Sequence, residues 1–141
     1  MAEPGYPLCR QTVTLYHPDP DAGTVTRTVV RGAFLDRRVR MVHTEQGQNR
    51  ASAFLLIIPE RSARRDADYT LAPGDRVLPG EGQAVAWADW DAFVPALVPG
   101  LCCVQYVDPK DWQGSPCHLE AGGWWTRSGS GAHSLTNCGG N

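Results

Sequence analysis

The sequence predicts an all-β fold: a small β-barrel or sandwich with a long early loop, one short helical segment and extended terminal arms. Three observations predict this class. Short segments rich in β-branched and aromatic residues recur along the chain, as they do in half-buried strands. The chain has 15 glycines and 11 prolines, too many for a helical protein, and they separate these segments as turns. A length of 141 residues suits one domain with a modest core.

The first half of the chain predicts four strands separated by turns. A turn rich in proline and aspartate, residues 17–23, joins the first two strands as a hairpin. Gly32 marks a bulge before the third strand. Pro59 ends the fourth strand, which is the most apolar segment of the chain. The predicted strands are residues 12–16, 24–30, 33–39 and 51–58.

The second half predicts shorter strands around one helical segment. Trp90, Phe93 and Val94 are spaced i, i+3 and i+4, so one or two helical turns over residues 87–94 present an apolar face. We expect that face to cover an open end of the sheet. The predicted strands here are residues 75–78, 83–86, 101–107 and 117–121, the last of them an edge strand, and residues 108–116 are expected to be a loop.

Residues 41–50 interrupt the strand pattern and form the candidate functional loop. They are polar, contain a glycine and show neither helical nor strand periodicity. We expect an exposed, mobile loop, and loops of this length in compact domains often carry function. Its residues are Met41, Val42, His43, Thr44, Glu45, Gln46, Gly47, Gln48, Asn49 and Arg50.

Composition divides the chain into three parts. Residues 1–10 are expected to form an irregular N-terminal arm, and residues 11–123 the barrel. From Gly122 onward, glycine, serine, threonine and asparagine dominate, which predicts a flexible C-terminal tail over residues 124–141.

Charge is unevenly distributed, although the formal net charge is only −2. That balance argues against a strongly electrostatic nucleic-acid binder. Most arginines lie between residues 27 and 65, and the rest of the chain is acidic. Faces of opposite sign would help copies or partners pack together, although an ordinary solvated arginine face is the alternative. The candidate contact residues are Arg37, Arg38, Arg64 and Arg65, together with Trp112, Trp124 and Trp125, since tryptophans bury large areas at interfaces.

No pattern in the sequence predicts catalysis, a cofactor or a metal site. His118 and Glu120 have the H-x-E spacing of zinc deaminases, but the P-C-x-x-C that completes that motif is missing. The cysteines lack metal-ligand or disulfide-framework spacing and are expected to be free thiols. The start of the chain does not resemble a signal peptide. The cysteines are Cys9, Cys102, Cys103, Cys117 and Cys138.

The order of several segments resembles a family of phage proteins. The chain is similar to the small minor capsid, or head–tail connector, proteins of long-tailed phages and prophages, and especially to head-closure (stopper) proteins. The resemblance extends over about residues 11–123 and depends on the order and spacing of short motifs. These motifs are residues 12–16, 29–35, 53–59, 73–77, 80–82, 104–111, 114–115 and 122–123, with Tyr69 and His118.

The resemblance implies a structural role in the phage neck. It implies a β-barrel whose copies form a six- or twelve-fold ring at the head–tail junction of the virion, assembled in the host cytoplasm. The ring would meet portal and adaptor proteins on the head side and tail-completion or tail-tube proteins on the tail side. A loop between early strands, here residues 41–50 by position, would enter the channel and help retain DNA without sequence readout. No membrane is implied.

Two alternatives remain open. The first is a tail-completion or capsid-associated minor protein of the same virion. The second, from another class, is a monomeric β-barrel module that binds sugar or peptide through its tryptophans.

Overall fold

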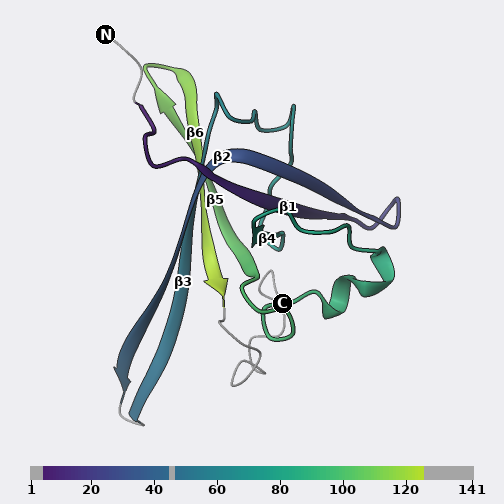
Figure 1. Cartoon of the computed structure of the whole chain (residues 1–141), viewed down its shortest axis with the longest axis vertical. Coiled ribbons are helices and arrows are strands. Elements are labelled where there is room, and N and C mark those ends of the chain that lie inside the picture. The colour runs from purple at the N-terminus through teal and green to yellow at the C-terminus, as the bar shows by residue number, and fades with distance from the viewer. Residues whose placement is uncertain (1–4, 45–46, 126–141) are drawn as a thin grey trace.

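The structure is a computed structural model and describes residues 5–44 and 47–125. Six strands and one short 3-10 helix, η1 (Trp87–Ala92), make up its regular elements. Figure 1 shows these elements along the chain. The strands are β1 (Gln11–Asp19), β2 (Thr24–Thr44), β3 (Gly47–Pro59), β4 (Arg76–Pro79), β5 (Cys102–Trp112) and β6 (Ser115–Trp125).

The six strands form a closed barrel in the order β1-β2-β3-β6-β5-β4, and all their pairings are antiparallel. The predicted all-β class is therefore confirmed, and the architecture is a barrel and not a sandwich. β6 lies between β3 and β5, so the prediction of an edge strand at residues 117–121 is wrong. Closure gives the strands of the barrel partners on both sides.

Strand β2 changes its pairing partner at Gly32, from β1 to β3. The residues before Gly32 pair with β1, and those from Phe34 onward pair with β3. Gln11 lies opposite Ala33 and Thr12 opposite Arg31, so Gly32 is the extra residue of a bulge, as predicted. Its φ of 86° is one that glycine adopts without strain.

The predicted loop over residues 108–116 is a hairpin. β5 continues to Trp112 and β6 begins at Ser115, which lie opposite each other. Gln113 and Gly114 both have positive φ, 51° and 84°, as in the type I′ turn that suits a two-residue hairpin. The expectation of a nine-residue loop is therefore wrong, because the turn needs only two residues.

The predicted helical segment is confirmed as η1, whereas the predicted strand at residues 83–86 is not a strand. Trp90 is buried. Phe93 packs edge-on against Tyr16 of β1, with ring centroids 4.7 Å apart. Arg76 of β4 holds this segment by donating hydrogen bonds to the carbonyl oxygens of Trp90 and Phe93, each at 2.7 Å.

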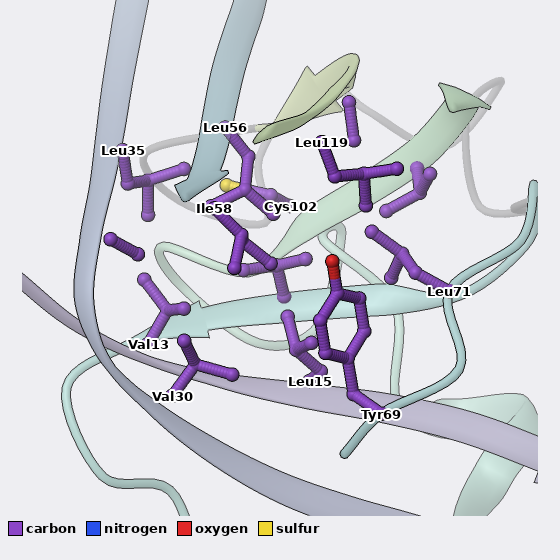
Figure 2. Close-up of a cluster of buried hydrophobic side chains, with 14 of the residues drawn as sticks. Val13, Leu15, Val30, Leu35, Leu56, Ile58, Tyr69, Leu71, Cys102 and Leu119 are labelled. Carbon is purple, nitrogen blue, oxygen red and sulfur yellow. The ribbon is translucent and has the colours of Figure 1, made fainter. Parts of the chain in front are cut away.

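The core lies inside the barrel and draws side chains from every strand (Figure 2). Alternate residues of each strand point inward, as the period of two requires. Tyr69 and Leu71, from the connection between β3 and β4, complete the cluster. The core residues labelled in Figure 2 are Val13, Leu15, Val30, Leu35, Leu56, Ile58, Tyr69, Leu71, Cys102 and Leu119.

Candidate functional site

The predicted loop at residues 41–50 is a β-hairpin, so the expectation of a loop is wrong. Thr44 of β2 lies opposite Gly47 of β3, and the pairing continues residue by residue back to Phe34 opposite Ile57. The strands are already paired inside the barrel, and their ladder continues past its end. Glu45 and Gln46 lie outside the described residues.

This hairpin forms a two-stranded arm, which we define as residues 39–44 of β2 and 47–52 of β3. β1 pairs with β2 only as far as Ala33, and β6 pairs with β3 only from Ala53 onward. Each strand of the arm is therefore paired on one side only within the described part of the chain. At the usual rise per strand residue the arm is about 20 Å long. Figure 1 shows it extending away from the barrel.

Trp125 joins the two strands where the arm leaves the barrel. Its indole N–H donates to the carbonyl oxygens of Arg38 at 3.2 Å and Ala53 at 2.9 Å. These two residues are cross-strand partners. The guanidinium carbon of Arg37 lies 5.0 Å from the centre of the Trp125 ring, within reach of a cation–π contact. The sequence did not indicate this clamp, because nothing in it placed Trp125 next to β2.

Trp124 and Trp125 are the last residues of β6 and are only 8 % and 6 % exposed. The prediction that they begin a flexible tail is therefore wrong, and little of either ring is left for a partner. Two glycines before them suggested a tail, but Gly123 is a packing position. A Cβ built on it would lie 2.0 Å from the carbonyl oxygen of Cys103.

The predicted contact residues Arg37 and Arg38, at the root of the arm, are exposed, unlike the two tryptophans. Arg38 pairs with Asp36 at 2.6 Å.

The remaining predicted contact residues, Arg64, Arg65 and Trp112, lie around the β5–β6 turn. Trp112 borders a hollow of about 380 Å³, and Arg65 borders a smaller one of about 160 Å³. Both hollows are also lined by Glu60 and Pro116, so we treat them as one groove. Arg64 is exposed and pairs with Glu60 at 3.4 Å.

The structure adds two groove residues that were not among the predicted contacts, Tyr6 and Arg61. Arg61 donates to the carbonyl oxygen of Tyr6 at 3.2 Å, and its guanidinium lies 5.8 Å from the Tyr6 ring centre. Arg61 belongs to the same arginine-rich run as Arg64 and Arg65, which was the available signal. Tyr6 had no signal, because its position depends on contacts with β6.

Tyr6 fastens the start of the chain to β6. Its hydroxyl contacts the sulfur of Cys117 and lies 2.6 Å from Nδ1 of His118. Nε2 of His118 is 3.8 Å from Glu120, as expected for residues two apart on one face of a strand. Cys9 is also buried. Residues 5–10 are therefore irregular, as predicted, and are held to the barrel through Tyr6 and Cys9. Residues 1–4 lie outside the described part.

Two neighbouring buried residues with ionisable side chains, Asp75 and Arg76, lie where β4 begins. Asp75 is 2 % exposed and accepts hydrogen bonds from the Ala72 amide, at 2.9 Å, and from Nδ1 of His17, at 2.8 Å. Burial raises the pKa of Asp75 to about 6, although these hydrogen bonds oppose the increase. Burial likewise lowers the pKa of Arg76 to about 10. These groups hold the connections on either side of β4 and do not face the groove.

Three cysteines carry free thiols: Cys9, Cys102 and Cys117. Cys103 is disulfide-bonded, so the expectation of a free thiol is wrong for this residue. Among residues 5–44 and 47–125, no three histidine, cysteine or acidic side chains are grouped as metal ligands. The described residues also contain no helix with the length and apolar character needed to cross a membrane.

Comparison with known proteins found no matching family model, curated protein or solved structure. Membership of the connector family therefore stays a prediction from the sequence.

Proposed function

We propose that this chain is a head-closure connector of a bacteriophage neck. In this proposal its copies form a six- or twelve-fold ring that closes the DNA-filled head and joins it to the tail. The ring lies at the head–tail junction, between portal or adaptor proteins and tail-completion or tail-tube proteins. The observation that carries the proposal is the two-stranded arm that leaves the closed barrel.

The shape of the chain supports this role. The sequence resemblance implies a small β-barrel with a projecting connection between early strands. Here the barrel is closed, and the connection between β2 and β3 extends beyond it as a two-stranded arm. Because Trp125 fixes the root of the arm, the barrel can hold the arm in a defined direction. A channel element needs that property to meet DNA at a constant position.

The charge of the arm and its root also supports the role. Arg37, Arg38, Arg40 and Arg50 lie in this region, opposed by only Asp36 and Glu45. Arginines favour contact with the phosphate backbone irrespective of base sequence. A channel that passes or holds DNA of any sequence requires contact of this kind.

The alternative of a sugar-binding module has weaker support. Such a module needs exposed aromatic rings, whereas Trp90, Trp124 and Trp125 are buried. Trp87 is 40 % exposed and Trp112 is half-buried, but they lie on different elements. No observation favours the tail-completion alternative over head closure.

A shortened arm tests the proposal. Arg38 and Ala53 lie directly opposite each other, so replacing residues 39–52 with Asn-Gly closes the hairpin with a two-residue turn. We expect the barrel to fold, with Trp125 still in place, and the particles to lose packaged DNA. The measurement is nuclease-protected DNA per particle after complementation of the virus that encodes the chain, with the amount of incorporated protein determined by mass spectrometry.

The β1–β2 turn provides a matched control. Asp19 and Thr24 are also cross-strand partners, so residues 20–23 can be replaced with the same Asn-Gly turn. This variant should retain DNA as the wild type does. If the shortened arm is incorporated and retains DNA equally well, the arm does not hold DNA. If the wild-type chain is absent from particles, the neck proposal is wrong.

A further inference from the structure

We propose that the groove beside the β5–β6 turn binds the η1 segment of a second copy of this chain. This inference rests on the proposed ring and names the contact that would build it. In this contact, Trp87 of the second copy enters the larger hollow. Asp89 and Asp91 of that copy lie against Arg61 and Arg65.

The groove is suited to an acidic segment that carries an aromatic side chain. Its larger hollow, about 380 Å³, is bordered by Trp112, Tyr6 and Arg61, which can contact an indole through ring stacking and a cation–π interaction. Arg61 and Arg65 form no ion pair with any described residue, unlike Arg64, which is paired with Glu60. Arg61 also donates to the Tyr6 carbonyl oxygen, but neither guanidinium has a carboxylate partner among the described residues. Basic side chains outnumber acidic ones along the groove, since Arg61, Arg65 and Lys110 border it with Glu60 and Asp111, so it can still receive carboxylates.

The η1 segment has the matching chemistry. Trp87 is 40 % exposed, and Leu97, just beyond the helix, is 66 % exposed. Asp89 and Asp91 are exposed, and neither forms an ion pair within the described residues. The segment is held to the barrel through Trp90, whose carbonyl oxygen accepts a hydrogen bond from Arg76. An acidic, aromatic surface is thus presented on a fixed backbone.

The two surfaces lie on different parts of the molecule. Figure 1 places η1 away from the β5–β6 turn and from the connection that follows β3. A contact that joins different surfaces of identical chains is heterologous, and repeated contacts of this kind generate rings or filaments. Each copy would use its groove for one neighbour and its η1 segment for the other.

Mixing of charge variants tests this contact in purified protein. The groove variant is Arg61→Glu with Arg65→Glu, and the η1 variant is Asp89→Arg with Asp91→Arg. Wild-type protein should show concentration-dependent amide shifts at both surfaces by NMR, up to about 1 mM. For each variant alone, the dissociation constant of self-association should be at least about tenfold higher than that of the wild type. Mixed at equal amounts, the unmutated groove of one variant meets the unmutated η1 segment of the other, and the two reversed charge sets are again opposite in sign, so the mixture should regain association that neither variant shows alone.

Matched variants separate this contact from a general charge effect. Arg31→Glu and Asp21→Arg change exposed charges elsewhere on the barrel and should leave self-association unchanged. A wild-type protein without concentration-dependent shifts overturns the inference, as does a mixture that associates no more strongly than either variant alone. If the controls weaken association equally, a specific contact is also excluded. A normal neck in particles that carry the groove variant would overturn this contact and leave the proposed function standing.

Discussion

Gly123 shows how closely β5 and β6 approach each other. A Cβ on Gly123 would lie 2.0 Å from the carbonyl oxygen of Cys103, whereas the three atoms nearest to one on Gly122 all belong to the Tyr106 side chain. Tyr106 is 47 % exposed and can rotate away, but main-chain atoms cannot. Gly123→Ala should therefore lower the free energy of unfolding by more than about 2 kcal/mol, and Gly122→Ala by clearly less. Urea denaturation measures both, and equal losses would contradict this packing.

Asp75 makes the stability of the barrel depend on pH. Burial raises its pKa from 3.8 to about 6, so the native state binds this proton more tightly than the unfolded chain. The stability contributed by the protonated carboxyl is complete below about pH 4 and is lost as the pH rises through about 6. The asparagine of Asp75→Asn does not titrate, so the variant does not lose this contribution as the pH rises. Between pH 4 and 7 it should therefore gain up to about 3 kcal/mol relative to wild type.

Urea denaturation at a series of pH values measures this gain. Asp21→Asn, in the exposed β1–β2 turn, is the control and should follow the wild-type pH profile. A difference between Asp75→Asn and wild type that stays constant from pH 4 to 7 would show that Asp75 does not titrate in this range.

At the scale of elements, Trp125 determines how firmly the arm is held. Trp125→Phe keeps an aromatic ring but removes the N–H that donates to Arg38 and Ala53. We expect a loss of about 1–2 kcal/mol in the free energy of unfolding, with faster amide hydrogen exchange in residues 39–44 and 47–52. Trp87→Phe is the control, because Trp87 is 40 % exposed and its indole donates no hydrogen bond to any residue that the structure describes. Unchanged exchange in the arm would contradict the clamp.

The sequence predicted those elements whose local pattern agrees with their tertiary environment. The β1–β2 hairpin, the Gly32 bulge and η1 were predicted because alternation, turn residues and i, i+3, i+4 spacing are local signals. The arm was missed because its residues do not alternate. Their strand conformation comes from the ladder that begins at Phe34 and Ile57. Local composition also misplaced Trp124 and Trp125, since their burial depends on β2, β3 and β5.

The candidate site was predictable in part. The sequence singled out the segment that became the arm, and it named Arg65 and Trp112, which border the groove. It did not indicate that Tyr6 and Arg61 lie beside Trp112, since these contacts join segments more than 50 residues apart along the chain. Contacts over such separations depend on how the barrel closes, and no local sequence pattern indicates that.

At the scale of the whole molecule, barrel closure explains why the arm is the exposed feature. Each barrel strand has two neighbours, whereas both strands of the arm are paired on one side only over six residues each, so the arm carries unpaired backbone groups along both edges. The groove and η1 add surfaces of opposite chemistry on different parts of the same rigid frame. A small barrel with one arm and two complementary surfaces is suited to assembly around a channel.

Cryo-electron microscopy of the head–tail junction tests the central claim most directly. The measurement is the position of this chain in particles of the virus that encodes it. We expect a ring of six or twelve barrels below the portal, with residues 39–44 and 47–52 of every copy pointing into the channel. Arms that point away from the channel, or a junction that lacks this chain, would contradict the account.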